Sequence, residues 1–405
     1  MAVIVLDWQE RSLAWTCAKH AAAKGKRFIL DNLNWYREGI AWQFIKPSKH
    51  RRENEDRARA FSEMMLRYQG RTTMANTPLI EAATMTALVA WLSMKKPIPI
   101  WKLPDIFDPK SSTYRRVLSD CTEADVCKEL ARWKELTKAA QRYELGPAHR
   151  MFRATLGSEP FRLRCQGNFN LPKFLKDGGM VLIEGGHVSP EAKRAVFGAI
   201  LQHITHLAIH RKFKTPVIVV CDEAHEYAGS QEANALRELL KFNVLLHMIS
   251  QSLFGDSEIQ EAMLQNSERI EIYRCDSTAS AHRFAGMILP GLPWETKLQD
   301  VQYQIMRLRR RERFVREGNR SWREYAPYVE DPYPWPSLTE KRTWQAIRKS
   351  IGEHGDRFCV IGSEKTQAPQ DKPSEPSPES TPNLPSPAMK LRAALSRNSN
   401  ASEES

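Results

Sequence analysis

The chain has 405 residues, 41% of them hydrophobic, which is enough to bury one large core or the cores of two domains. Its formal net charge of +12 suits an anionic partner such as nucleic acid, although an ordinary basic surface gives the same excess. The seven cysteines lack CxxC spacing and no apolar run reaches the roughly 20 residues of a membrane helix, which argues against a zinc ribbon, a disulfide framework or a spanning segment and favours the cytoplasm.

The first elements form a strand–helix–strand pattern. Ala2 to Leu6 is continuously apolar and rich in β-branched residues, which predicts a buried strand. An alanine-rich helix is expected over residues 12–24, ended by Gly25, and Arg27 to Leu30 predicts a second strand. A βαβ unit of this kind implies a parallel sheet.

The middle of the chain has a different character. Residues 50–167 carry few strand signals, and Ile80 to Trp91 and Ala124 to Tyr143 have the periodicity of helices. We expect an all-helical insertion there, between two parts of an α/β core at residues 1–49 and 168–330.

Strand and helix patterns alternate again after the insertion. Strands are predicted at Met180 to Ile183, Pro216 to Cys221, Val244 to Ser250 and Ile270 to Arg274, and helices at about 190–211 and 231–241. This alternation predicts a doubly wound, mainly parallel α/β sheet.

The C-terminal part is more polar. Residues 302–317 read as an arginine-rich hairpin, and residues 331–362 as a C-terminal extension. Residues 363–405 are rich in proline, serine and glutamate, a composition that cannot bury a core and predicts a disordered tail.

Polar residues follow two of the predicted strands. Asp222 and Glu223 come directly after the most apolar strand, and Gln251 follows the next one. Ligands bind at the carboxyl edge of open α/β sheets. Nucleotide hydrolysis needs one carboxylate for the Mg²⁺ shell, which suits Asp222, and one to orient the attacking water, which suits Glu223. Gln251 could sense a γ-phosphate; a strand that ends in acids and a helix-capping turn are the simpler alternatives.

Taken in order, these segments resemble the HerA/FtsK/VirD4-TraG group of P-loop ATPases, and most closely the type IV secretion coupling proteins. The resemblance runs from Ala2 to about Arg316. It is carried by VIVLD at 3–7, AKGKRFILDN at 23–32, NTPLIEAATMTALVAWL at 76–92, GGMVLIEGG at 178–186, VIVVCDEAHEY at 217–227, LKFNVLLHMISQSL at 240–253 and LQNSERIEIYRC at 264–275.

The resemblance implies a RecA-like core with an all-helical insertion, working as a ring hexamer that uses ATP and Mg²⁺ to move DNA. It gives Asp222 and Glu223 the Walker B roles, with Asp222 as the Mg²⁺ ligand. It places Gln251 on the neighbouring strand and Asn266 and Arg274 in the following strand motif. It implies a cytoplasmic location, with membrane association only through a segment that this sequence does not contain.

The chain departs from this pattern at three places. No GxxxxGK[ST] loop occurs, so the phosphates lack their cradle of backbone N–H groups unless another chain or segment carries it. Asp7 begins an Asp-Trp-Gln-Glu sequence where the family often has Asp-Pro-Lys-Gly-Asp, which leaves Asp7 as a nucleotide-binding candidate. Leu240-Lys-Phe-Asn replaces a motif whose arginine acts on a neighbour's nucleotide; Arg237, Lys241 or Arg274 could substitute.

Other interpretations of single motifs remain open. Asp222 to His225 also spells the DEAH box of superfamily 2 helicases, without the accompanying helicase motifs. His203, His206 and His210 share one face of a predicted helix, so they could bind zinc, although solvent-facing histidines are the simpler interpretation.

Basic residues suggest where DNA could bind. Arg307, Arg309, Arg310 and Arg311 belong to the densest arginine run, which fits phosphate contacts or equally a solvated hairpin. Within the insertion, Arg51, Arg52, Arg57 and Arg59 are further candidates. A chain without a phosphate loop could also be a catalytically inactive DNA-binding or ring-assembly module.

Overall fold

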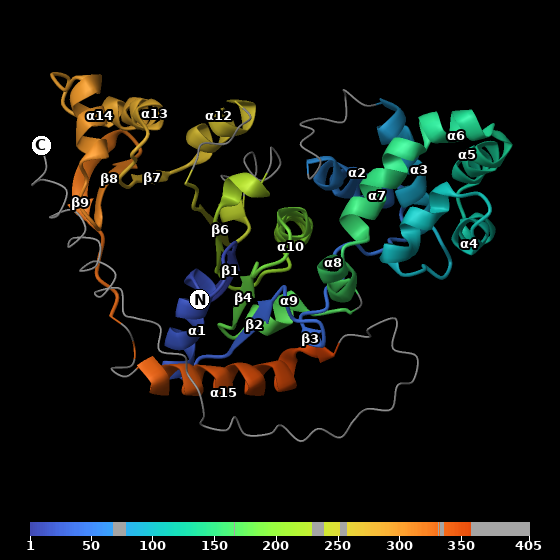
Figure 1. The fold of residues 1–405 in the computed structure, drawn as a ribbon, viewed down its shortest axis with the longest axis horizontal. Coiled ribbons are helices and arrows are strands. Elements are labelled where there is room, and N and C mark those ends of the chain that lie inside the picture. The colour runs from blue at the N-terminus through green and yellow to red at the C-terminus, as the bar shows by residue number, and fades with distance from the viewer. Residues whose placement is uncertain are drawn as a thin grey trace, which may run out of the picture. The chain divides into compact units, whose positions relative to one another are not determined.

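The structure is a computed structural model. It describes residues 1–67, 78–165, 167–228, 239–251, 257–330, 332 and 336–357 (Figure 1). The predicted tail at 363–405 and most of the predicted helix at 231–241 lie outside these described residues.

A five-stranded sheet in the order β2-β4-β1-β5-β6 forms the centre of the fold, and each neighbouring pair of strands is parallel. The strands are β1 (Ala2–Asp7), β2 (Phe28–Asn32), β4 (Met180–Glu184), β5 (Val217–Cys221) and β6 (Val244–Met248). The predicted parallel α/β sheet is therefore confirmed. The first two strands are parallel but not adjacent, because β4 pairs with both of them.

Helices cover both faces of this sheet, as continuously apolar parallel strands require. Alternate side chains of β1, such as Ile4 and Leu6, share a core with α10 (Pro190–Ile209). Val5, between them, points to the other face, where α1 (Leu13–Ala23) and α15 (Pro336–His354) pack.

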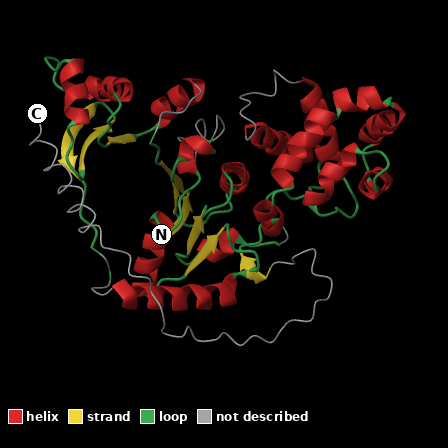
Figure 2. Ribbon diagram, viewed as in Figure 1, coloured by secondary structure: helices red, strands yellow, loops and turns green. Residues whose placement is uncertain are grey.

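The segment between β2 and β4 is built mainly from helices (Figure 2). After β3 (Glu38–Gly39) come α2 (Arg51–Arg67), α3 (Pro78–Leu92), the 3-10 helix η2 (Ile100–Phe107), α4 (Ser112–Asp120), α5 (Ala124–Glu135), α6 (Lys138–Glu144), α7 (Gly146–Leu156), α8 (Glu159–Arg164) and α9 (Leu171–Leu175). The single helix predicted over 124–143 is two helices, because the hydroxyl oxygen of Thr137 accepts the N–H of Ala140 and caps a new one.

A second, antiparallel sheet follows in the order β7-β8-β9. It contains β7 (Arg269–Ile272), β8 (Glu312–Glu317) and β9 (Arg320–Tyr325), with α12 (Ser257–Asn266) before it and α13 (Thr278–Ile288), η4 (Leu289–Gly291) and α14 (Leu298–Met306) between its first two strands. Two expectations were wrong here. The strand predicted at 270–274 does not join the parallel sheet, since it pairs with β8 instead. The predicted hairpin at 302–317 is shifted, because residues up to Met306 continue a helix and the true hairpin joins β8 to β9.

The C-terminal extension returns to the parallel sheet. Helix α15 packs against α1 and β2, and its Trp344 and Ile347 belong to the core on the same face of the sheet as Val5. The short β10 (Asp356–Arg357) pairs with β3. Among the described residues, no helix is both long and apolar enough to cross a membrane.

Candidate functional site

Acidic and amide side chains lie in a row at the carboxyl edge of the parallel sheet. The strand register places Asn32 of β2 beside Glu184 of β4, and Glu184 beside Asp7 of β1. Asp222 and Glu223 leave the next strand, β5, one step further along the row. The predicted convergence of strand-end acids is therefore a property of the sheet itself.

Asp7 and Asp222 form a pair of carboxyl groups on adjacent strands. Asp7 is fully buried, and its oxygens accept the N–H groups of Gln9 at 3.1 Å and Ala14 at 2.7 Å. Burial, together with the neighbouring charges of Asp7 and Glu223, raises the pKa of Asp222 to about 6. The Asp7 carboxyl is hydrogen-bonded to Asp222, and burial raises its pKa as well. Below about pH 6 this pair holds a proton, and above it a cation could offset the repulsion between the two carboxylates.

Glu223 is fixed by its backbone and by its partners. Its φ of 48° is in the left-handed region, which costs a non-glycine residue about 1 kcal/mol. Its carboxylate is buried, with Oε2 accepting the backbone N–H of Gln251 at 3.3 Å and lying 3.4 Å from Nδ1 of His225. Strain of this kind gathers at functional sites. Glu223 and Gln251 thus meet through the Gln251 backbone, while the role predicted for the Gln251 side chain stays a prediction.

Glu184 also belongs to this row, although sequence reasoning did not select it. It is buried, and it accepts Nδ2 of Asn32 at 2.9 Å and the N–H of Arg11 at 3.2 Å. Burial, together with the charge of Asp7, raises its pKa to about 7. The signal was present in the sequence, because Glu184 ends an apolar strand just as Asp222 follows one.

Two cations of α10 border the row and were also missed. Lys193 donates to the carbonyl of Trp8 at 2.9 Å and lies 5.3 Å from the centre of the Trp8 ring. Burial lowers its pKa, while the charge of Asp7 acts in the opposite direction. Arg194, the next residue, is ion-paired with Glu226. The Trp8 ring in turn stacks on Tyr227, which fixes the loop after β1 against the turn after β5.

Within the part of the chain that the structure describes, neither Arg274 nor Lys241 is hydrogen-bonded or ion-paired to this acidic row. Arg274 follows β7 of the antiparallel sheet, is exposed, and pairs with Asp276 at 2.9 Å. Lys241 is exposed just before β6. Arg237 lies outside the described residues.

Of the three histidines, His210 at the end of α10 is exposed, as the simpler interpretation expected, whereas His203 and His206 are partly buried. His203 packs edge-on against the buried Trp42 with ring centres 6.0 Å apart. Burial lowers the pKa of both His203 and His206 to about 4, so both are neutral. In the part of the chain that the structure describes, no group of three or more His, Cys, Asp or Glu side chains is arranged to hold a metal ion.

The lack of such a three-ligand group among the described residues does not conflict with the predicted Mg²⁺ site. Mg²⁺ is usually held by one or two protein carboxylates together with water and substrate phosphates. The Asp7–Asp222 pair supplies carboxylates at the sheet edge, so the residues fit an ion that a nucleotide completes rather than an all-protein cage.

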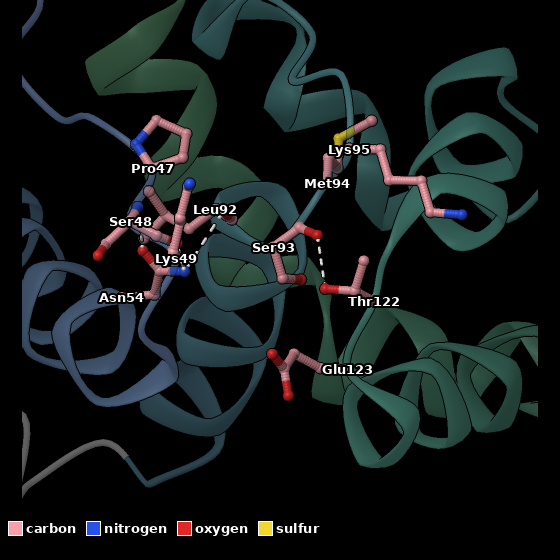
Figure 3. Close-up of a pocket in the computed structure, with 10 residues that line it drawn as sticks. All are labelled: Pro47, Ser48, Lys49, Asn54, Leu92, Ser93, Met94, Lys95, Thr122 and Glu123. Carbon is pink, nitrogen blue, oxygen red and sulfur yellow. Dashed lines mark hydrogen bonds between the residues drawn. The ribbon is translucent and has the colours of Figure 1, made fainter.

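A cavity of about 280 Å³ lies elsewhere, in the helical segment (Figure 3). It is lined by residues 47–49, Asn54, 92–95 and 122–123. Asn54 bonds the backbone of Ser48 and Leu92, and Thr122 donates to the carbonyl of Ser93 at 2.9 Å. Because these polar groups satisfy one another, the cavity is a packing feature between helix ends.

Comparisons with known proteins agree with this architecture. No family model matches the chain, and no curated protein matches it either. The fold is similar to that of a solved bacterial conjugative coupling protein, TrwBdeltaN70. Its trigonal form has a TM-score of 0.52 at 12% identity over 83% of this chain and 88% of that chain. Its monoclinic form has a TM-score of 0.51 at 12% identity over 82% and 86%.

A third solved structure, VirB4 of Thermoanaerobacter pseudethanolicus, has a TM-score of 0.49 at 15% identity over 82% of this chain and 83% of that chain. The TrwBdeltaN70 matches establish the fold. The chain has the RecA-like α/β architecture of a conjugative coupling protein, as the sequence predicted.

Proposed function

We propose that the chain is the acid-bearing part of a DNA-translocating coupling ATPase. In this role Asp222 holds Mg²⁺, Glu223 orients the attacking water, and Gln251 contacts the γ-phosphate. The observation that carries the proposal is the row of buried carboxylates at the sheet edge, where Asp7, Glu184 and Glu223 are each at most 7% exposed. Burial raises the pKa of Asp7, Glu184 and Asp222 in this row, and perturbed acids in such a position are typical of functional sites.

The roles proposed for the strand-end acids follow from their surroundings, which differ between the Asp7–Asp222 pair and Glu223. The Mg²⁺ ion that accompanies ATP would supply the positive charge that the Asp7–Asp222 pair lacks, and would favour the ionised form of both carboxyl groups. Glu223 is held by the N–H of Gln251 and by His225, which keeps its carboxylate in one orientation. A fixed carboxylate can orient a water molecule for attack on a phosphate.

The phosphate loop must come from outside the described residues. Strand β6 has one partner, β5, among the strands that the structure describes. Leu245 and Ile249, on one face of this edge, are 41% and 44% exposed. Parallel sheets are normally buried on both faces, and an apolar edge of this kind is complementary to another strand. We infer that a strand followed by a phosphate-binding turn pairs with β6 and places that turn beside Gln251.

Other parts of the proposal come from the fold likeness. A ring of subunits, probed by analytical ultracentrifugation, would bring a cation from one subunit to its neighbour's nucleotide; Arg274 and Lys241 are exposed and fit that role. DNA would be the transported substrate, in keeping with the net charge of +12.

The test compares two forms of the protein. The 405-residue chain alone should bind a fluorescent ATP analogue weakly at physiological Mg²⁺, because it lacks the cradle. The product of the complete reading frame, if that frame encodes a phosphate loop, should hydrolyse ATP. Glu223→Gln should lower kcat by at least about 100-fold while binding persists, and Asp222→Asn should weaken the Mg²⁺ dependence of binding.

A second function is favoured by one observation, the lack of a GxxxxGK[ST] sequence anywhere in the 405 residues. It is an inactive RecA-like module that binds DNA or assembles with an active homologue. Tight ATP binding by the 405-residue chain, lost in an Asp222→Ala/Glu223→Ala variant, would rule it out. ATP turnover that is unaffected by Glu223→Gln would rule out the ATPase role proposed for this site.

A further inference from the structure

The arginines around the antiparallel sheet fall into two groups that differ in their partners. On the strands, Arg269 pairs with Glu271 at 2.8 Å and with Glu324 at 3.3 Å. Arg313 pairs with the same two acids, at 2.5 Å and 2.7 Å. These guanidinium groups are neutralised within the sheet and have little charge to offer a ligand.

The loop between α14 and β8 is different. Its arginines, Arg307, Arg309, Arg310 and Arg311, are all exposed, and none of their side chains forms an ion pair with another described residue. The acid that follows them, Glu312, is buried. It accepts the N–H of Arg309 at 2.7 Å, the hydroxyl of Tyr325 at 2.6 Å and the guanidinium of Arg323 at 2.6 Å. These donors hold the pKa of Glu312 at about 2, so its charge serves the hairpin and not the loop.

Exposed aromatic rings accompany this loop. Tyr303 on α14 is 54% exposed, and the guanidinium of Arg307 lies 4.0 Å from the centre of its ring. Tyr328 is 67% exposed, with Arg311 at 5.4 Å. Tyr325 is 59% exposed, while its hydroxyl is fixed to Glu312. Rings that are largely exposed and held in place are stacking surfaces.

Backbone geometry holds the loop and the rings together. The N–H of Ala326 donates to the carbonyl of Arg311 at 2.7 Å, and Nε of Arg311 donates to the carbonyl of Ala326 at 3.1 Å. Arg311 has a φ of 71°, a region that favours glycine and costs another residue about 1 kcal/mol. The Arg311 side chain therefore joins the loop to the segment after β9, through Ala326 and the Tyr328 ring.

We propose that this surface, named here the arginine–tyrosine ridge, binds single-stranded nucleic acid. The ridge consists of residues 307–311 with Tyr303, Tyr325 and Tyr328. Its arginines contact phosphates and its tyrosines stack on unpaired bases. A duplex offers no free base faces, and an acidic peptide offers nothing for the rings to stack on, so single strands use both features of the ridge. The inference rests on the proposed function only in taking DNA as the partner.

The test uses the 405-residue chain without nucleotide and a fluorescein-labelled oligo-dT of about 20 nucleotides, followed by anisotropy over a salt series. The ridge variant is Arg307→Gln/Arg310→Gln/Arg311→Gly, in which glycine suits the backbone at 311. Its affinity should fall at least about 10-fold, and the slope of log K against log salt should become shallower by about 2.

A charge-matched control removes three cations from the helical segment, as Arg115→Gln/Arg116→Gln/Lys128→Gln. It should bind the oligonucleotide within about 2-fold of the wild type, because these exposed residues have no aromatic neighbours of this kind. An equal loss in the control, or unchanged binding by the ridge variant, would overturn the assignment of the ridge.

The stacking part has its own measurement. An abasic oligonucleotide keeps the phosphates and removes the bases, so the wild type should bind it about 10-fold more weakly than oligo-dT. That difference should shrink in a Tyr303→Leu/Tyr328→Leu variant. Equal binding of oligo-dT, abasic strand and duplex would overturn the single-strand proposal. In each variant, Mg²⁺-dependent ATP binding by the complete reading-frame product should be unchanged, which separates failure at the ridge from failure at the sheet edge.

Discussion

Two buried acids at the carboxyl edge of the same sheet have opposite surroundings. Asp31, in β2, is fully buried and meets the guanidinium of Arg164 at 2.6 Å and 2.9 Å. Arg164 is buried as well and also donates to the carbonyls of Asn32 and Pro160. Asp7, two strands away in β1, has another acid, Asp222, as its side-chain partner.

On the proposed function, the difference separates a structural acid from one that binds Mg²⁺. The Asp31–Arg164 pair joins the end of α8 to β2 and leaves no charge uncompensated, so it fastens the helical insertion to the sheet. The Asp7–Asp222 pair concentrates negative charge, and the backbone N–H groups that Asp7 accepts do not neutralise it. A fold keeps such a pair when a cation or a proton completes it.

The largest expected effect on stability comes from breaking the Asp31–Arg164 ion pair. Arg164→Ala leaves Asp31 buried without its counter-charge, so the free energy of unfolding should fall by about 3–5 kcal/mol in chemical denaturation. The double variant Arg164→Met/Asp31→Asn should recover much of that loss, because it removes both charges and keeps an acceptor for the N–H of Ile40. A single variant as stable as the wild type would mean that the two sites do not differ as described.

Removing a charge from the Asp7–Asp222 pair should stabilise the fold instead of destabilising it. Asp222→Asn removes a repelling charge, so at about pH 8 the melting temperature should rise by about 2 °C. Asp276→Asn is the control, because Asp276 is exposed and its neighbour is Arg274; it should leave the melting temperature unchanged. Destabilisation by Asp222→Asn would show that the carboxylate serves the fold.

The pH dependence of stability sharpens the comparison. The pKa of Asp222 is raised from 3.8 to about 6, and that of Glu184 from 4.5 to about 7. Over this range the folded chain holds protons that the unfolded chain has released, so these groups lower stability as pH rises through the window. The difference in melting temperature between Asp222→Asn and the wild type should therefore grow between about pH 5 and pH 8. A constant difference would contradict the raised pKa.

The smallest effect is that of the metal alone. Mg²⁺ at millimolar concentration should raise the melting temperature of the wild type at about pH 8 by about 1 °C, because it binds the folded chain and offsets the repulsion between the ionised acids. The shift should be lost in Asp222→Asn and kept in Asp276→Asn. An identical shift in melting temperature in all three proteins would show that Mg²⁺ binds elsewhere and not at Asp222.

Elements that depend on local sequence patterns were predicted correctly, and elements that depend on contacts between distant residues were not. The five strands of the parallel sheet were predictable because each is a short, largely apolar run with polar residues at or just after its end. The β7 strand was misplaced because its pattern, Arg-Ile-Glu-Ile, does not say which partner it will have. Glu184 shows the same limit, since an acid at the end of a strand becomes part of a site only through its neighbours.

By itself the sequence determined the alternation of strands and helices, the position of Asp222, Glu223 and Gln251 at strand ends, and the missing phosphate loop, because these are local patterns. Only the tertiary structure decided which charges are compensated. Asp31 and Arg164 are separated by 133 residues along the chain, and Asn32 and Glu184 by 152. Whether an acid is neutralised depends on which distant residue the fold brings to it, and no local pattern carries that information.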